Sequence, residues 1–582
     1  MSRLTSPGSG VRSLLRCALL ATGFALALPA VGHAATFEVN TTTGTNTPGC
    51  GATVVGCNTI TYAIAEAAGS AVPDTINVAA GDYPELVDIP ETEVGLTLRG
   101  PKAAVAGRLR TGLAATGEAR IVSPVSLELP AINVVADNVT VEGFAISNSQ
   151  RIGVLLLKDS ATIRNNVIRD NTIGLWINPT TSASDVTGNN FDGNNHANGG
   201  SLFSPGYGIY SPGGMTAIIG ANAITNNLFT NHDVSGIDIN ADPDEEHGFP
   251  ARQTSENVSI TGNEFGAQTG TGPAPHIYAS RLIGTSKIEG NTLADSDSDG
   301  IFADGAGLSI SKNKIDKSAG AGIKLTAPAD CSTPGCTASA GIKINGNTIT
   351  NSTSAGVLIR VGAVADGQTV NVHYNRFAGN ATAVRNTDPA TVDAENNFYN
   401  CNAGPGGAPC DDVVGADADP YLVLKATASP TALTTPGAST ITASFLANNA
   451  GPLAEPTLTS AQALFPATTV GFGVAGVGTL SAPNATTSAG VASVTDSSTA
   501  AGSSTVTATA GAVNVTIALG DAAQADGVGR QAPAAQGVRH GHPGVRRELC
   551  REGQRHREGA HRGQGQDQDL HAVTGHAGDR RG

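Results

Sequence analysis

The sequence predicts an all-β protein in which a parallel β-helix is followed by a β-sandwich. The first observation is a short phrase that recurs in register: an Asn, a polar residue and an aliphatic residue, then, nine residues after the Asn, a Gly followed by a β-branched residue. The second is the composition, because 73 Gly with only 4% aromatic and 14% charged residues suits an extracellular all-β solenoid. The third is an abrupt loss of charge after residue 421.

The phrase runs from Asn291 to Gly300, from Asn313 to Gly322 and from Asn347 to Gly356. Related versions begin at Asn166, Asn227, Asn263 and Asn375. Each apolar run is too short for a helix and alternates as a strand does. Such a unit cannot bury its apolar face alone and must stack on a copy of itself, which indicates a β-helix over residues 71–421. An antiparallel sandwich with Asn-Gly turns is the alternative, but sandwiches do not repeat one phrase in register.

The beginning of the chain reads as a secretory signal over residues 1–34. Arg3, Arg12 and Arg16 form a basic region, residues 17–28 form an apolar region, and Gly32-His33-Ala34 is a small-residue cleavage site. The apolar region is too short to span a bilayer, and no other segment is long enough. We therefore expect a secreted or cell-surface protein without membrane insertion.

The cysteines fit an oxidising compartment. They form three close pairs, each flanking a loop that contains Gly or Pro: Cys50/Cys57, Cys331/Cys336 and Cys401/Cys410. We interpret these pairs as local disulfides, because no His stands beside them at zinc-binding spacing. Cys17 lies in the signal and Cys550 is left over.

The net charge argues against some partners. Removing residues 1–34 (3 basic, no acidic) and 521–582 (10 basic, 8 acidic) from the totals of 34 and 49 leaves 21 basic and 41 acidic residues, a net charge of −20. Such a surface repels nucleic acid and anionic membranes. It also disfavours a bare polyanion as ligand unless a cation bridges the two.

Residues 35–70 predict an N-terminal cap. A strand is expected at 37–40 and a short helix at 58–68, where Ile60, Ala63, Ile64 and Ala67 have helical spacing and Asn58 or Thr59 can serve as N-cap. A helix here would cover the open end of the β-helix, which otherwise exposes a sheet edge and the core.

Two stretches resemble a known family. The opening Asp74-Thr75-Ile76 to Tyr83 and the closing 395–406 (ENNFYNCNAGPG) are similar to secreted bacterial right-handed, single-stranded β-helix proteins of the pectin-lyase-like superfamily, with its PbH1-type repeats. The run 57–64 (CNTITYAI) is similar to a Cys-Ser-Leu-Arg-Glu-Ala-type cap, although it is one residue longer and lacks the Arg-Glu. The resemblance covers about residues 36–422. It implies the fold, while the superfamily includes lyases, hydrolases, epimerases, adhesins and inert stalks.

Residues 422–520 predict an Ig-like sandwich. Strand-like runs at 439–446, 470–474, 491–494, 504–507 and 513–519 are separated by turn signals. Gly478-Thr479-Leu480 and Gly490-Val491-Ala492 resemble the bacterial Ig-like repeats of invasin-type surface proteins, which implies spacing or adhesion.

Residues 521–582 fit neither domain. They contain 10 Arg, no Lys and no Phe, Ile or Tyr. One interpretation is a disordered basic tail. We favour a frameshift near Gly520, because codons for this stretch, read one nucleotide later, can encode a strand pattern.

The phrase also predicts which side chains point outward. The residue after each Gly-aliphatic pair should stack from coil to coil in one exposed row. The expected row is Leu155, Trp176, Tyr210, Asp238, Tyr278, Phe302, Lys324, Leu358 and Arg385. Its aromatic residues suit the C–H faces of sugars, and we take Trp176, Tyr210, Asp238, Tyr278, Phe302 and Lys324 as candidate ligand-binding residues. The alternative is that the aromatics stack on one another or lie under longer loops.

An acidic loop leaves the same face. Asp238, Asp242, Asp244, His247 and Arg252 are the candidate catalytic residues, and Asp242, Asp244 and Glu245 are the candidate calcium ligands. His247 or Arg252 could take the proton α to a uronate while calcium stabilises the enolate, as in a polysaccharide lyase or C5-epimerase. Paired acids could instead hydrolyse a glycosidic bond. The alternative is a solvated acidic turn.

Two classes of function follow from these patterns. The first is a non-catalytic module that binds a polysaccharide or cell-surface glycan or mediates adhesion. The second is a polysaccharide lyase or epimerase that uses calcium. The Ig-like module and the lack of a recognisable catalytic series favour the first.

Overall fold

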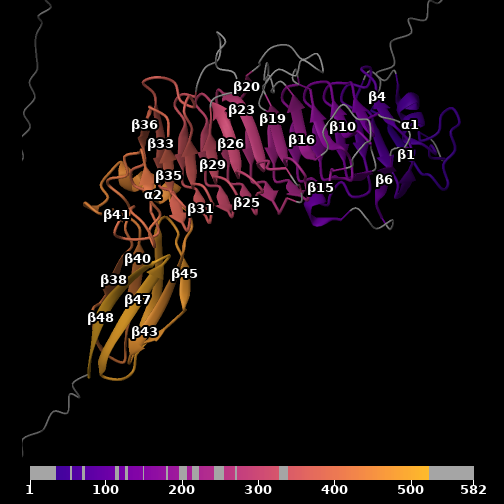
Figure 1. The fold of residues 1–582 in the computed structure, drawn as a ribbon. Helices are drawn as coiled ribbons and strands as arrows, with labels where there is room; N and C mark the ends of the chain where they lie inside the picture. The colour runs from indigo at the N-terminus through magenta and orange to yellow at the C-terminus, as the bar shows by residue number, and fades with distance from the viewer. Residues whose placement is uncertain are drawn as a thin grey trace, which may run out of the picture. The chain divides into compact units, whose positions relative to one another are not determined.

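The computed structural model describes residues 34–52, 55–68, 72–111, 117–122, 124, 129–147, 150–178, 181–195, 206–212, 222–240, 254–268, 270, 272–326 and 339–523. These residues form a β-helix and a C-terminal β domain. The strands of the β-helix repeat coil after coil along three long parallel sheets (Figure 1). The predicted parallel β-helix is therefore confirmed.

The first sheet, sheet A, contains β1 (Thr36–Val39), β2 (Thr75–Val78), β5 (Thr97–Arg99), β8 (Thr140–Glu142), β11 (Thr162–Arg164), β14 (Asp185–Thr187), β17 (Ala223–Thr225), β21 (Ser259–Thr261), β24 (Lys287–Glu289), β27 (Ser309–Ser311), β30 (Lys343–Asn345), β33 (Thr369–His373) and β36 (Thr391–Asp393). Sheet B contains β3 (Gly81–Tyr83), β6 (Ala119–Val122), β9 (Phe144–Ser147), β12 (Val167–Arg169), β15 (Asn190–Asp192), β18 (Leu228–Thr230), β22 (Glu264–Phe265), β25 (Thr292–Ala294), β28 (Lys314–Asp316), β31 (Thr348–Thr350) and β34 (Arg376–Ala378).

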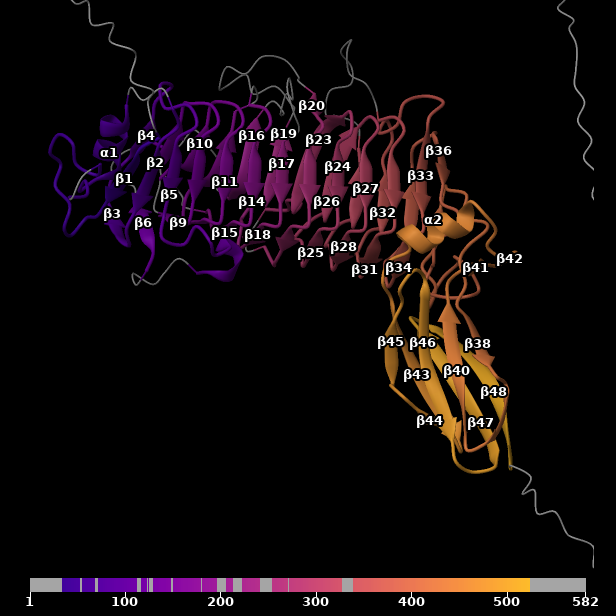
Figure 2. The same cartoon turned by 180° about the vertical axis from the view of Figure 1, so that it is seen from behind.

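Sheet C contains β4 (Val87–Ile89), β7 (Ile132–Val134), β10 (Ile152–Leu156), β13 (Ile173–Ile177), β16 (Tyr207–Pro212), β19 (Ile237–Asn240), β23 (Ile277–Ile283), β26 (Ile301–Gly305), β29 (Ile323–Leu325), β32 (Val357–Ile359), β35 (Val384–Asn386) and β37 (Val413–Val414). The short β20 (Ser255–Glu256) also pairs with β23. The reverse view shows the same stacking of the three sheets (Figure 2).

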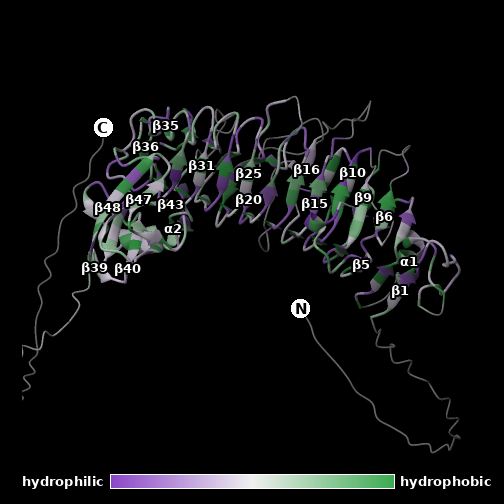
Figure 3. Ribbon diagram, turned by 90° about the horizontal axis from the view of Figure 1, so that it is seen from below, coloured by the Kyte–Doolittle hydropathy of each residue, from purple (hydrophilic) through white to green (hydrophobic). Residues whose placement is uncertain are grey.

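Side chains alternate along each strand, so that apolar residues point into the core and polar residues point outward. In β28, for example, Ile315 is buried while Lys314 is exposed, and in Figure 3 the strands carry both green and purple segments. The inward residues stack in rows, as Phe191, Phe229 and Phe265 do with nearly parallel rings 5.0 and 4.8 Å apart. Burial of these rows is the dominant favourable term for folding, so each coil is stable only on its neighbours.

The Asn of the repeated phrase forms a buried ladder at the turn between sheets A and B. Its members are Asn166, Asn189, Asn227, Asn263, Asn291, Asn313, Asn347, Asn375 and Asn397. The Nδ2 of Asn291 donates to the Oδ1 of Asn313 in the next coil (2.9 Å) and to the carbonyl of Ile260 in the preceding coil (2.9 Å). Its Oδ1 accepts from the backbone N and the Nδ2 of Asn263. The ladder satisfies the buried amide on both sides, which explains why this position is Asn.

The Gly of the phrase is required by close stacking on the next coil. A Cβ at Gly322 would collide with the side chain of Ile349 and with the carbonyl of Gly356. Gly therefore stands directly before β26, β29 and β32, where a Cβ would collide with a carbonyl of the next coil.

The predicted cap helix is confirmed as α1 (Ile60–Ala67). Its N-cap is Thr59, whose Oγ1 accepts from the backbone N of Tyr62 at 3.3 Å. Ile60, Ala63, Ile64 and Ala67 are buried, as their spacing predicts. The predicted disulfides Cys50–Cys57 and Cys401–Cys410 are formed, with Cα atoms 5.0 and 5.3 Å apart. Cys331 and Cys336 lie outside the described residues, as does nearly all of the predicted signal.

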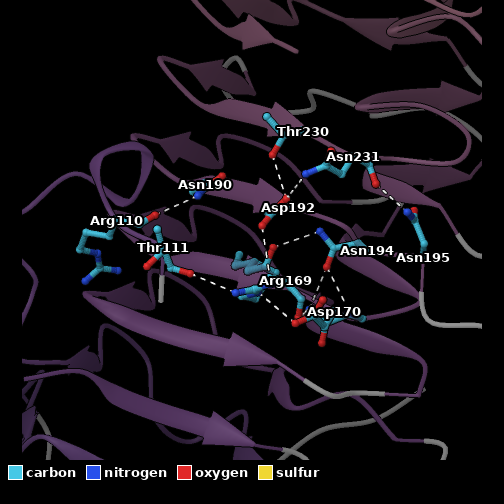
Figure 4. Close-up of polar contacts among 12 residues, drawn as sticks. Arg110, Thr111, Arg169, Asp170, Asn190, Asp192, Asn194, Asn195, Thr230 and Asn231 are labelled. Atoms are coloured by element: carbon cyan, nitrogen blue, oxygen red, sulfur yellow. Dashed lines mark hydrogen bonds and ion pairs between the residues drawn. The ribbon is translucent and has the colours of Figure 1, made fainter. Parts of the chain in front are cut away.

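Polar contacts between coils also join the outer side of sheet B, near the short 3₁₀ helix η1 (Gly107–Leu109). Asp192 accepts from the Oγ1 of Thr230 at 3.0 Å and from the Nδ2 of Asn231 at 2.7 Å, while Arg169 lies between Asp170 and Asp192 (Figure 4). Arg169 offsets part of the negative charge of the two Asp residues, and the whole group lies on a face other than sheet C.

The C-terminal domain is a two-sheet β-sandwich compatible with an Ig-like fold. One sheet contains β38 (Lys425–Ser429), β40 (Gly437–Ser444), β46 (Val491–Ser498) and β44 (Thr479–Leu480); the other contains β39 (Ala432–Thr435), β48 (Val513–Ala523), β47 (Gly502–Ala510), β43 (Thr469–Gly476) and β45 (Asn484–Thr486). The hairpin β41 (Ala447–Asn448) and β42 (Gly451–Pro452) and the helix α2 (Thr457–Leu464) complete it.

Four of the five predicted strand runs of this domain lie within observed strands, and the fifth, 439–446, extends two residues past the end of β40. β38, β39 and α2 were not predicted, because their small polar residues carry weak periodicity. β48 continues to Ala523, three residues past the predicted end of the domain, and Asp521 is buried in it. Residues 524–582, for which we proposed a frameshift, lie outside the described residues.

Candidate functional site

The predicted outward residues form one continuous row on sheet C. Strand pairing places Leu155, Trp176, Tyr210, Asp238, Tyr278, Phe302, Lys324, Leu358 and Arg385 opposite one another in successive strands. The register follows from the constant length of the repeated phrase, because side chains alternate with a period of two along a strand. We call these nine residues the outer row.

The exposure that we expected along the whole outer row is wrong at Trp176 and Asp238. Trp176 is 4% exposed and packs with Ile152 and Ile173, and its ring meets that of Tyr210 edge-on at 5.1 Å. Asp238 is 8% exposed. Apolar side chains on the outer side of three consecutive coils thus form a small core of their own, and Trp176 offers no sugar-stacking surface.

Tyr278 and Phe302 are half-buried and stack on each other. Their ring centroids are 4.7 Å apart and the rings are nearly parallel. The Nζ of Lys324 lies 5.1 Å from the centroid of Phe302 and 2.9 Å from the Oδ2 of Asp299. Because the ring faces look along the β-helix, a ligand lying on the sheet would meet ring edges. This arrangement agrees with the alternative that the aromatics stack on one another.

A hollow of about 390 Å³ opens at the far end of the outer row. Its lining combines hydroxyl, guanidinium and aliphatic groups: Thr326, Ser354, Leu358, Arg360, Val361, Arg385 and Thr387. Leu358 and Arg385 belong to the outer row, and Val361 is 68% exposed. We call this feature the arginine hollow. Such a mixture of polar and apolar groups in a concave surface is typical of small-ligand sites.

A β-bulge interrupts sheet C beside Tyr278. Ala279 pairs with Ala303 and Leu282 with Gly305, so Ser280 and Arg281 together face the single Asp304. Arg281 adopts φ +54°, a left-handed conformation that is unfavourable for a non-Gly residue. Bulges of this kind re-aim side chains and are over-represented near active sites.

Buried polar groups meet at this bulge. Asp304 is 1% exposed and accepts from the backbone N of Arg281 at 2.8 Å and from the Oγ of Ser280 at 3.0 Å. Arg281 is 7% exposed, and its Nε and Nη2 have no hydrogen-bond partner in the described part of the chain. These three residues were not among the sequence-based predictions. The sequence does contain a sign of the bulge. Two polar residues, Ser280 and Arg281, stand between the inward residues Ala279 and Leu282, whereas regular alternation places a single outward residue there.

The predicted catalytic and calcium-binding residues of the acidic loop are only partly placed. Asp242, Asp244, Glu245, His247 and Arg252 lie outside the described residues. The strands on either side of that segment, β19 and β20, both pair with β23, on the two sides of the bulge. Among the residues that the structure describes, no three His, Cys, Asp or Glu side chains lie together as a metal site, and no helix is long and apolar enough to cross a membrane.

Comparison with family models gives two matches. Residues 204–403 match the right handed beta helix region family, and residues 131–244 match the periplasmic copper-binding protein (NosD) family. No curated protein matches the chain by sequence.

Three solved structures are distantly similar to this chain. Pectate lyase Pel9A is 12% identical, with 67% of this chain and 80% of that chain covered and a TM-score of 0.31. An alginate lyase from Paenibacillus sp. str. FPU-7 is 13% identical, with 62% and 97% covered and a TM-score of 0.34. The tailspike protein gp49 from Acinetobacter baumannii bacteriophage Fri1, a capsular polysaccharide depolymerase, is 12% identical, with 79% and 74% covered and a TM-score of 0.36. Likeness at this level says nothing about activity. On its strand stacking and its family matches, the chain is a right-handed parallel β-helix protein.

Proposed function

We propose that this protein is an exported glycan-binding module, at the cell surface or secreted, that binds a polysaccharide on the outer face of sheet C. The observation that carries the proposal is the arginine hollow, an open concavity on a rigid sheet. Hydroxyls of Thr326 and Ser354 can exchange hydrogen bonds with sugar hydroxyls, and Leu358 and Val361 offer aliphatic surface to sugar C–H groups.

The outer row is continuous with this hollow, so a linear ligand can contact both. Phe302, Lys324, Leu358 and Arg385 are consecutive in it, so Phe302 and Arg385 are three strand spacings apart. At about 4.8 Å per spacing the distance is about 14 Å, which a short oligosaccharide spans. The two disulfides and the match to a periplasmic family support export.

A glycan microarray with the full chain tests the proposal, followed by titration calorimetry of the best ligand. We expect binding that weakens several-fold in Thr326→Val and Ser354→Ala, because each removes one hydroxyl without a change of charge. Thr369→Val, on the exposed side of sheet A, is the matched control. Absence of binding to any glycan would leave an adhesive or purely structural role.

A second candidate function is a polysaccharide lyase or C5-epimerase that acts on uronates. The observation that favours it is the strained and buried Arg281, with Asp304 beside it. A guanidinium held at a sugar carboxylate would acidify the proton on the neighbouring carbon. Incubation with polyuronates and calcium tests this activity through unsaturated products and inversion at C5. Neither product would form if the face only binds, whereas a product that disappears in Arg281→Gln would establish a reaction.

A further inference from the structure

The two arginines of the arginine hollow lack the carboxylate partners that most described cations of the β-helix possess. Within the described residues, the following cations are paired with Asp or Glu: Arg99, Arg108, Arg110, Arg120, Lys158, Arg164, Arg169, Lys287, Lys312, Lys317 and Lys324. Arg360 and Arg385 form no ion pair in the same part of the chain. Lys102, Arg281, Lys314, Lys343 and Arg376 likewise form none there, and Arg360 and Arg385 differ from them because they line one hollow together.

Both cations line one concavity. Arg360 follows the last residue of β32, and Arg385 lies in β35, the strand that pairs with β32. Two like charges in one hollow repel each other, and an anion between them would relieve that repulsion. Hydroxyls of Thr326, Ser354 and Thr387 surround them. An anionic group flanked by alcohol groups matches this lining.

We infer that the arginine hollow recognises the anionic group of an acidic sugar, with Arg360 and Arg385 as its ligands. The inference rests on the proposed glycan binding and adds the class of ligand. A guanidinium fork binds a planar carboxylate bidentately, and it also binds sulfate. The chemistry common to both is a single negative charge on a sugar ring.

The overall acidity of the protein bears on this inference. The net charge repels a polyanion at long range, so association should be slow and should accelerate when salt screens that repulsion. The local contact with two arginines acts at short range, within the hollow. A polyanion would therefore be recognised by its contact in the hollow and not by long-range steering. This departs from the sequence-based expectation that a bare polyanion needs a bridging cation.

The probes for the experiment are an oligogalacturonate, its fully methyl-esterified form and a sulfated galactan oligosaccharide of similar length. Titration of the full chain with each probe, without added divalent cation, measures the affinity. The variants are Arg360→Gln and Arg385→Gln. Lys343→Gln, which removes the same charge from the exposed side of sheet A, is the matched control. All three side chains are exposed, so the fold should persist and circular dichroism can verify it.

We expect the acidic probe to bind at least about ten-fold more tightly than its methyl ester, and either arginine variant to lose about that factor, since hydrogen bonds to a charged group contribute this much. Lys343→Gln should bind as the wild type does. If oligogalacturonate binds more tightly than the sulfated galactan, the recognised group is a carboxylate. If the galactan binds more tightly, the recognised group is a sulfate.

Equal affinity for acid and ester, unchanged in both arginine variants, would overturn the acidic-sugar inference and leave glycan binding intact. Loss of affinity in Lys343→Gln equal to that in the arginine variants would also overturn it, because the effect would then be one of overall charge. No binding of any probe, together with an empty glycan microarray, would overturn the proposed function itself.

Discussion

Replacing one Asn of the buried ladder should destabilise the β-helix locally and by a calculable amount. In Asn291→Ala the backbone N of Asn263 and one hydrogen of its Nδ2 each lose their partner, and the carbonyl of Ile260, which lies in a paired strand of sheet A, loses one of its donors. The Oδ1 of Asn313 keeps the backbone N of Asn291 as donor. Two buried donors left unsatisfied at about 1 kcal/mol or more each give a loss of about 2 kcal/mol or more.

The assay has to resolve local unfolding, because coils of a solenoid contact only their neighbours. Equilibrium denaturation gives the global effect, and hydrogen exchange at the backbone N of Asn263 gives the local one. Asn371→Ala, on the outer side of sheet A, is the control. Asn291→Asp adds a stringent comparison, because a carboxylate retains the acceptor but not the two donors. The reasoning is refuted if Asn291→Ala and Asn371→Ala unfold at the same denaturant concentration and the Asn263 amide is equally protected from hydrogen exchange in both variants.

Three other predictions concern buried side chains. Burial lowers the pKa of His232 and of His276 to about 4, whereas both have a pKa of about 6.5 in the unfolded chain. Between pH 6.5 and pH 4 the unfolded chain therefore binds more protons, and the stability of the fold should decrease as the pH falls. His232→Asn should reduce this loss of stability in acid denaturation curves, and an unchanged curve would refute the assignment. Trp176→Ala should lower the free energy of unfolding by about 3–5 kcal/mol, whereas Tyr278→Ala, half-buried, should cost less; equal losses in denaturant melts would contradict the buried position of Trp176. Asp304→Ala leaves the Arg281 amide and the Ser280 hydroxyl without an acceptor and should cost about 2–4 kcal/mol by the same measurement, while a neutral result would mean that the bulge does not depend on this carboxylate.

The direction of side chains could be predicted from the sequence because it depends only on periodicity. The spacing from Asn313 to Gly322 recurs in other coils, so it assigns the same register to each. Pairing of Phe302 with Lys324 and of Leu358 with Arg385 follows from that assignment. The capping helix could be predicted for the same reason, since Ile60, Ala63, Ile64 and Ala67 depend on helical spacing alone.

The depth of side chains could not be predicted in this way. Trp176 points outward as expected, yet it is buried because Ile152, Ile173 and Tyr207 place apolar groups beside it in three consecutive coils. These three residues each stand three positions before the outer-row residue of their own coil, so their proximity to Trp176 can be recognised only when neighbouring coils are compared. The bulge at Arg281 could not be predicted for a different reason. It adds one residue to a strand, and a prediction based on constant spacing does not include positions where the spacing changes.

The outer row changes its chemistry along the β-helix, and this change locates the candidate function. Around Trp176 the outward groups satisfy one another in an apolar cluster. At Phe302 and Lys324 the cation is paired with Asp299. Toward Arg360 and Arg385 the face presents a concavity whose charges are not compensated by described neighbours. A solenoid can repeat a structural position without repeating a function, because each coil contributes its own outward residue to a common scaffold. The ligand should therefore be sought at the end of the row nearest β35, and substitutions near Trp176 should affect stability and leave binding unchanged.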